Sequence, residues 1–204
     1  MKLTWLGHSC FILEADGYRL VTDPYADVAG YGDLSVQAHA IYCSHDHFDH
    51  NAVGRVTLLP ARESPFTVRE IETFHDEKGG ALRGKNTVRV FEAGGVSVAH
   101  LGDLGHQLND EQLRAIGKTD AVLVPVGGVY TVDAQGAKAV CDALAPRCIV
   151  PMHYRHAPYG LPNVAPAEDF LALYGDVKRL DTNAFELTAD CCGVLVPKYL
   201  GNCA

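Results

Sequence analysis

The segment from residue 44 to residue 50 concentrates side chains that bind metal ions. It reads Ser-His-Asp-His-Phe-Asp-His, and its histidines and aspartates are His45, Asp46, His47, Asp49 and His50. His45 and His47 are two positions apart, so in extended backbone both side chains project to the same side. Imidazole nitrogens and carboxylate oxygens suit zinc, manganese or iron, and the segment has no thiol that would favour a closed structural zinc site. A polar surface loop rarely gathers these residue types at this spacing, so we predict a metal site.

The order of these residues resembles a known signature. His45-Asp46-His47-Phe48-Asp49-His50 matches the His-x-His-x-Asp-His pattern of the metallo-β-lactamase superfamily in full. Thr22-Asp23-Pro24 is similar to the early aspartate of that family, Gly102-Asp103 to its later Gly-Asp segment, and His153 to its last metal histidine. With Trp5-Leu6-Gly7-His8-Ser9 near the N-terminus, the chain looks most like the small stand-alone hydrolases similar to L-ascorbate-6-phosphate lactonase.

The resemblance implies two divalent metal ions that share one aspartate. The ligands of the first ion are His45, His47 and a third histidine, those of the second are Asp49, His50 and His153, and Asp103 bridges both. For the third histidine we favour His75, because it follows a strand-like stretch in a Gly-rich loop. His100 is the alternative. It precedes Asp103 on the same strand and fits better as a hydrogen-bonding partner of a ligand.

Two metal ions roughly 3.5–4 Å apart can share a water and lower its pKa to about 7. We therefore predict a metal-dependent hydrolase whose metal-bound hydroxide attacks a small ester, lactone, amide or phosphoester. Asp49 and Asp103 are the catalytic residues, and Asp49 also steers the proton of the attacking water. Zinc is the first expectation for the metal, and manganese or iron suits the same ligands. The sequence has no Gly-x-Ser-x-Gly elbow that would support a serine nucleophile.

Further residues are candidates for orienting the ligands or contacting the substrate. Lys78 and Arg83 lie in the loop after His75 and could receive an anionic group, although a solvated loop explains them equally well. Asp23 is expected to orient a loop or a ligand histidine. The remaining candidates are His8, His100 and His106, which lie beside the motif segments, and Tyr130 and Tyr154, which could line the substrate side.

The composition limits other classes of function. The 25 acidic and 17 basic residues give a formal charge of −8, which opposes binding to the phosphates of nucleic acids. A nuclease of the same superfamily, similar to the tRNA 3′-processing enzymes, is therefore an alternative only, as is a non-catalytic metal-binding protein. We expect a small-molecule partner, which could be anionic, and neither nucleic acid nor a membrane. No apolar run approaches the roughly 20 residues that span a bilayer.

The cysteines and the N-terminus both indicate a cytoplasmic protein. The apolar stretch after Met1 is too short for a signal peptide. The seven cysteines form no Cys-x-x-Cys pair, so free thiols in a reducing compartment are the favoured interpretation. Cys191, Cys192 and Cys203 lie close together in the sequence, and we favour packing and a loose tail there over a metal site or a disulfide.

The elements that must position these residues form one predicted domain, residues 1–204, without a linker or a repeat. Alternating or continuous apolar runs predict strands at residues 3–6, 11–14, 19–22, 38–43, 63–73, 87–92, 96–99, 121–126, 147–151, 185–188 and 194–196. Helices are predicted at residues 51–56, 109–116, 133–145 and 166–174. This α/β mixture favours two packed sheets with helices outside. The resemblance implies the four-layer αββα sandwich of the metallo-β-lactamase type, with the site at one edge between the sheets.

Overall fold

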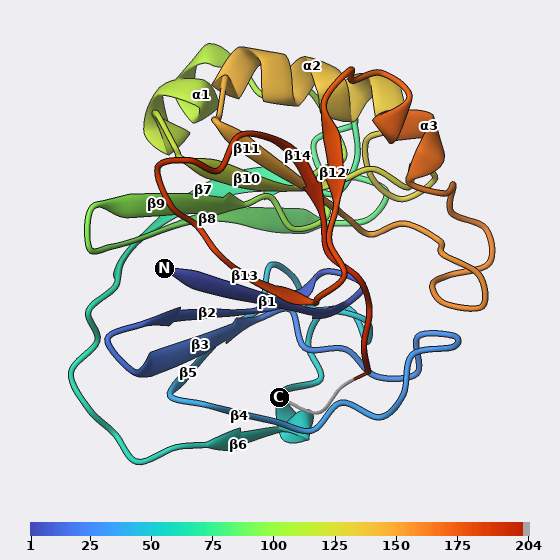
Figure 1. Cartoon of the computed structure of the whole chain (residues 1–204). Helices are drawn as coiled ribbons and strands as arrows, with labels where there is room; N and C mark the ends of the chain where they lie inside the picture. Colours follow the sequence, from blue (N-terminus) through green and yellow to red (C-terminus); the bar gives the residue numbers. More distant parts are fainter. Residues whose placement is uncertain (202–204) are drawn as a thin grey trace.

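Two β-sheets pack face to face in the computed structural model, which describes residues 1–201 (Figure 1). The first sheet has the strand order β13-β1-β2-β3-β5. Its strands are β1 (Lys2–Gly7), β2 (Cys10–Ala15), β3 (Tyr18–Thr22), β5 (Ala40–Tyr42) and β13 (Ala184–Glu186). The second sheet has the order β12-β14-β11-β10-β9-β8-β7. Its strands are β7 (Thr67–Phe74), β8 (Lys85–Ala93), β9 (Val96–His100), β10 (Ala121–Pro125), β11 (Cys148–Met152), β12 (Val177–Arg179) and β14 (Gly193–Val196).

Helices cover the outer face of the seven-stranded sheet (Figure 1). They are α1 (Asp110–Ile116), α2 (Ala134–Leu144) and α3 (Glu168–Leu171). The outer face of the five-stranded sheet is covered by loops, the 3₁₀ turn η1 (Val53–Arg55) and a two-stranded sheet of β4 (Val36–Ala38) and β6 (Val56–Leu58). These loops bury a small apolar cluster that includes Leu6, Ile12, Val21, Tyr25 and Val28. The predicted α/β sandwich of two packed sheets is confirmed, and the α-helices of residues 1–201 lie on one of its outer faces.

Strand direction brings the chemistry to one edge of the sandwich. In the five-stranded sheet β3 and β5 are parallel, and β1 runs in the same direction because β2 is antiparallel to both β1 and β3. In the other sheet β9, β10 and β11 are parallel, and β7 shares their direction through two antiparallel pairings with β8. The carboxyl ends of these strands therefore meet at one edge in each sheet, where α/β proteins commonly place a site.

The main core lies between the two sheets and under the helices. The central strand β10 is buried along its whole length, which explains its continuous apolar sequence Ala-Val-Leu-Val-Pro. Helix α2 turns Ala137, Val140, Cys141 and Leu144 inward, and the Asp133 side chain caps its N-terminus by accepting a hydrogen bond from the Gly136 N–H. The helix and the strand predicted for these residues are confirmed.

Three predicted elements differ from the structure. The short helix expected at residues 51–56 is one 3₁₀ turn followed by β6. The strand expected at residues 38–43 is divided into β4 and β5 at His39, whose Nδ1 accepts a hydrogen bond from the Arg19 N–H. The helix expected at residues 166–174 is limited to α3, and Pro166 precedes it. Strands β4, β6 and β12 have three residues each and are too short to give a period in the sequence.

Two findings concern the helices and the cysteines. No helix within residues 1–201 is both long enough and apolar enough to cross a bilayer. The six cysteines in the described part of the chain are free, Cys191 and Cys192 included. Cys203 lies outside the described residues, so the interpretation of the C-terminal cysteines stays a prediction for that residue.

Candidate metal centre

All seven candidate ligands follow the carboxyl ends of strands. His45, His47, Asp49 and His50 follow β5, His75 follows β7, Asp103 follows β9 and His153 follows β11. Three groups of ligand atoms lie within 4.8 Å of one another: His45, His47 and His75; His8, Asp49, His50 and His153; and His45, His50 and Asp103. Residues that lie more than 100 positions apart in the sequence are thus assembled into one cluster that can hold metal.

Asp103 lies at the centre of this cluster. Its Oδ2 is 3.2 Å from His75 Nε2 and 3.1 Å from His153 Nε2, and its Oδ1 is 3.2 Å from His50 Nε2. His75 belongs to the first group of ligands, whereas His50 and His153 belong to the second. The carboxylate of Asp103 therefore faces both groups, as a bridging ligand must.

Hydrogen bonds at the outer ring nitrogen decide which nitrogen faces inward. His50 Nδ1 donates to Asp23 Oδ2 at 2.8 Å, and His75 Nδ1 donates to the Tyr130 carbonyl at 2.9 Å. The Ser44 hydroxyl donates to Asp23 at 2.7 Å, so His45 Nδ1 donates to Ser44 Oγ at 2.9 Å. In all three histidines the Nε2 lone pair is then left to point at the cluster, which is the arrangement metal-binding histidines adopt.

The inward-facing atoms lack hydrogen-bond partners. His45 Nε2, His50 Nε2, His153 Nε2 and Asp103 Oδ1 are buried and accept or donate no hydrogen bond within the described chain. Leaving a polar atom buried and unsatisfied costs roughly 1–3 kcal/mol, so four of them at one point are costly. Divalent metal ions bound among these ligands would satisfy all four. This donor set of imidazoles and carboxylates fits zinc, manganese or iron.

The charges of the cluster favour the protonation states that metal binding needs at Asp103 and His45, whereas they favour a charged His50, which must lose a proton when a metal binds. Burial would raise the pKa of Asp103, but the imidazoles of His153 and His50 hold it well below its usual range. Burial also acts against the charged form of His50, yet Asp103 and Asp23 raise its pKa well above the usual value. Burial and the neighbouring His50 lower the pKa of His45 to about 3. Asp103 is thus an ionised acceptor and His45 a neutral donor at pH 7.

Asp23 and Ser44 hold the start of the ligand loop. Asp23 Oδ1 accepts a hydrogen bond from the Ser44 N–H at 2.6 Å, while its Oδ2 accepts from Ser44 and His50. Burial of Asp23 is outweighed by His50 and His100, which bring its pKa down to about 2. His100 Nε2 donates to the Ser9 carbonyl at 2.9 Å and lies 3.9 Å from Asp23 Oδ2. His100 therefore contacts Asp23 rather than the ligand cluster.

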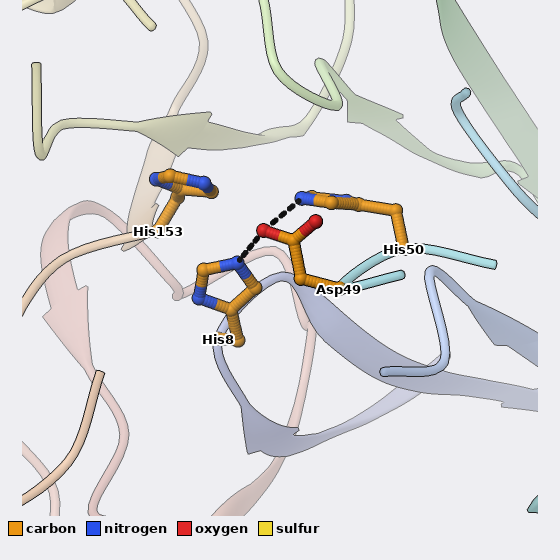
Figure 2. Close-up of side chains that lie close together, drawn as sticks. All are labelled: His8, Asp49, His50 and His153. Carbon is orange, nitrogen blue, oxygen red and sulfur yellow. Dashed lines mark hydrogen bonds and ion pairs between the residues drawn. The ribbon is translucent and has the colours of Figure 1, made fainter. Parts of the chain in front are cut away.

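His8 connects the turn after β1 to the second group of ligands (Figure 2). Its Nε2 is hydrogen-bonded to Asp49 Oδ2 at 3.3 Å, and its ring lies 4.3 Å from that of His153. Burial and His153 lower the pKa of His8 to about 4. The His8 carbonyl accepts hydrogen bonds from Trp5 Nε1 at 3.0 Å and from the His153 N–H at 3.4 Å. One turn of the five-stranded sheet thus holds both Asp49 and His153.

The loop after His75 is organised by a residue that the sequence analysis missed. The Asp76 carboxylate is buried and accepts four backbone hydrogen bonds, from the N–H groups of Lys78, Gly80, Leu82 and Arg83. The sequence does offer a signal for this role of Asp76. It is an aspartate just before a Gly-rich turn, and aspartate side chains commonly accept hydrogen bonds from the backbone N–H groups that follow them. His106 holds the carboxyl end of β7, directly before His75, because its Nε2 accepts a hydrogen bond from the Phe74 N–H at 3.1 Å.

A cavity of about 490 Å³ opens onto the cluster. It is lined by Asp46, His47, Phe48, Asp49, His75, Arg83, Asp103, Tyr130 and Leu161. Arg83 and Tyr130 are thus beside the ligands, where the sequence analysis expected substrate contacts. Lys78 and Tyr154 are not among the lining residues. Lys78 is exposed, and Tyr154 is buried against Trp5, with 5.7 Å between the ring centroids, so neither faces this cavity.

Comparison with known proteins gives the family. Residues 2–153 match the family of the β-lactamase superfamily domain, and that range contains every candidate ligand described above. The chain belongs to the metallo-β-lactamase superfamily. A UPF0173 protein of Pyrococcus furiosus is 32% identical over 183 residues, which cover 76% of this chain and 83% of the relative. A UPF0173 metal-dependent hydrolase of Carboxydothermus hydrogenoformans is 25% identical, with 83% of this chain and 91% of the relative covered.

A solved structure from Thermotoga maritima is similar over nearly the whole metallo-β-lactamase domain. It superposes with a TM-score of 0.77 at 39% identity and covers 96% of this chain and 97% of the other. That protein is described as a candidate Zn-dependent hydrolase of the metallo-β-lactamase superfamily. The likeness supports the arrangement of the two sheets and of the loops between them.

Two positions of the metallo-β-lactamase Gly-Asp segment have room only for glycine, because other parts of the chain lie against their Cα atoms. Gly102 has φ +54°, and a Cβ there would overlap Asn86 Oδ1 and Ser44 Cβ. Asn86 Oδ1 is also the acceptor for the Asp103 N–H at 2.9 Å, so this contact positions Asp103. A Cβ on Gly105 would overlap the backbone of His75 and Asp76. The segment must therefore lack side chains where it passes the loop of His75.

We predict that Gly105→Ala separates the His75 loop from Asp103, because backbone atoms cannot move aside cheaply. The variant should bind less metal and melt at a lower temperature than the wild type, by roughly 1–3 kcal/mol of unfolding free energy for an overpacked site. Gly54→Ala is the matched control, since a Cβ there has open space around it. Metal analysis and thermal unfolding should leave the control unchanged, and equal effects of both variants would contradict the close approach.

Proposed function

We propose that this protein is a hydrolase that uses two divalent metal ions on a small ester, lactone, amide or phosphoester. The observation that carries the proposal is the position of Asp103, whose two carboxylate oxygens lie 3.1–3.2 Å from imidazole nitrogens of both ligand groups. One carboxylate placed between two sets of ligands is the arrangement that a two-metal centre would require, and it supports the proposal. The names of the relatives, which include metal-dependent hydrolases, support the same class.

Seven side chains would hold the two ions. His45, His47 and His75 would bind the first, Asp49, His50 and His153 the second, and Asp103 both. Zinc is our first choice, with manganese and iron as alternatives for the same donors. His75 is preferred to His100 as the third histidine. His75 Nε2 is directed at Asp103, whereas His100 Nε2 is occupied by the Ser9 carbonyl.

When bound, the two ions supply Lewis-acid activation of a water and of the bond to be broken. Asp49 lines the cavity and is fixed by His8, so its carboxylate is placed to orient a proton of that water. In the net reaction, the water oxygen forms a bond to the electrophilic carbon or phosphorus of the substrate. The bond from that atom to the leaving oxygen or nitrogen breaks, and a proton from the water is transferred to the leaving group.

The dimensions and charge of the site favour a small molecule over nucleic acid. The cavity has about 490 Å³, within the range of small-ligand pockets, and Phe48 and Leu161 contribute to its wall. The chain carries a formal charge of −8, which repels a polyphosphate backbone. We therefore prefer a small-molecule hydrolase to the nuclease alternative, and we retain the cytoplasm as the proposed location. The resemblance of residues 5–9 to lactonases favours lactones for the first trials.

The proposed metal stoichiometry can be tested on the purified protein. Reconstitution with zinc or manganese should give about two equivalents of tightly bound metal by plasma mass spectrometry. Asp103→Ala should lose most of it, because the shared ligand is removed from both ions. His75→Ala should bind less metal than His100→Ala. Full metal content in Asp103→Ala would exclude the bridge, and a greater loss in His100→Ala than in His75→Ala would exchange their roles.

The proposed chemistry is tested with chromogenic esters and phosphodiesters. Metal-loaded protein should hydrolyse at least one class of small substrate, and dialysis against a chelator should lower the rate by more than 100-fold with recovery on adding metal back. Asp49→Asn should lower kcat by about 100-fold or more in protein that still contains metal. A rate that survives complete metal removal, or an undiminished kcat in Asp49→Asn, would be incompatible with this mechanism.

A further inference from the structure

We propose that the substrate carries a carboxylate that binds Arg83 and Tyr130, next to an apolar portion that lies against Phe48 and Leu161. All four residues line the cavity that contains His75 and Asp103. The inference rests on the proposed function, because it names the class of molecule that would be hydrolysed at the metal centre.

Arg83 is a cation without an acidic partner. Several other arginines are paired: Arg89 lies 2.8 Å from Glu70, Arg147 2.6 Å from Asp120 and Arg69 3.8 Å from Glu92. Among the arginines of residues 1–201 without a carboxylate at ion-pair distance, Arg83 lines the cavity at the ligand cluster, and its guanidinium lies 5.7 Å from the centre of the Tyr130 ring. A half-buried, unpaired guanidinium in a protein with a net charge of −8 is suited to binding an oxyanion through two parallel hydrogen bonds.

Arg83 is presented by a rigid loop. The Asp76 carboxylate accepts hydrogen bonds from four N–H groups of the loop, including that of Arg83 itself at 2.8 Å. Gly84 N–H donates to the Gly80 carbonyl at 2.9 Å, which closes the same turn. Little backbone freedom remains to be lost on binding, and a pre-organised site gains affinity for that reason. Lys78 belongs to the same loop but is exposed and is not among the residues that line the cavity.

Tyr130 supplies a second donor and a link to the metal ligands. Its hydroxyl oxygen accepts a hydrogen bond from Asn163 Nδ2, so the hydroxyl proton is directed elsewhere and can be donated to an oxyanion. The carbonyl of Tyr130 accepts the hydrogen bond from His75 Nδ1 at 2.9 Å. The residue that would bind the substrate anion therefore also orients a proposed metal ligand.

The charge and the wall of the cavity select a carboxylate over a phosphate dianion. One guanidinium matches one negative charge, and the Asp46 carboxylate on the cavity lining would repel a second. Phe48 is 60% exposed, and with Leu161 it offers apolar surface to the rest of the substrate. A molecule with a carboxylate at one end, an apolar segment and a hydrolysable carbonyl group satisfies all of these contacts.

The test compares three chromogenic esters of similar length on the metal-loaded protein: 4-nitrophenyl pentanoate, the mono-4-nitrophenyl ester of glutaric acid and 4-nitrophenyl 4-phosphonooxybutanoate. We expect kcat/KM to be about 10-fold to 100-fold higher for the glutarate ester than for the neutral ester, as a charge-assisted pair provides. Arg83→Ala should abolish this ratio, mainly through KM, and Tyr130→Phe should reduce it severalfold. Lys78→Ala is the matched control and should leave it intact.

Each outcome has a separate meaning. A ratio that is unchanged in Arg83→Ala, or no preference for the glutarate ester in the wild type, would overturn the proposal, and a preference for the phosphate ester would overturn the carboxylate assignment. If none of the esters is hydrolysed, the failure concerns the proposed function. Ligand-observed NMR then measures whether the protein binds the anionic N-butylglutaramate more tightly than the neutral N-butylpentanamide. A preference for the anionic amide that is lost in Arg83→Ala and kept in Lys78→Ala supports the anion site. Any other result overturns it.

Discussion

The buried carboxylate of Asp103 is the constraint on which the site depends. A charge removed from water is tolerated only when opposite charges or metal ions compensate it. Here His50, His75 and His153 surround the carboxylate from separate strand ends of both sheets. Packing of the two sheets against each other therefore brings these imidazoles together. The strand directions within each sheet place them at the same edge.

The surrounding contacts hold this cluster at a cost in backbone strain. His8, Asp23 and His153 have φ values of +49°, +43° and +52°, a region that side-chain-bearing residues seldom adopt. Such strain costs roughly 1–3 kcal/mol per residue and persists where neighbouring contacts over-determine the conformation. The hydrogen bonds of Asp23 to Ser44 and His50, and that of His8 to Asp49, provide those contacts. Ligands held in advance lose less freedom when an ion binds.

Much of the fold and the centre of the site could be predicted from the sequence, because their signals are local. Metal ligation shows in the spacing from His45 to His50, and burial shows in the apolar run of β10. The start of helix α2 shows in its capping residue, so each of these signals lies within a few residues. The preference for His75 over His100 had a local basis in the Gly-rich loop that follows a strand, but the contact that supports it, the ring nitrogen of His100 already bonded to Ser9, is not visible in the sequence. Which of Arg83 and Lys78 lines the cavity depends on the turn around Asp76, and the sequence does not show how that turn is folded. Tyr154 was misjudged because its neighbour His153 is in the site while its own ring packs on Trp5.

The central claim is that Asp103 joins two metal sites, and anomalous diffraction from crystals of the metal-reconstituted protein tests it most directly. Data collected on both sides of the absorption edge of the added metal should show two peaks, roughly 3.5–4 Å apart, on opposite sides of the Asp103 carboxylate. One peak should lie among His45, His47 and His75, and the other among Asp49, His50 and His153. A single peak at full occupancy, or two peaks of which one lies away from Asp103, would contradict the account.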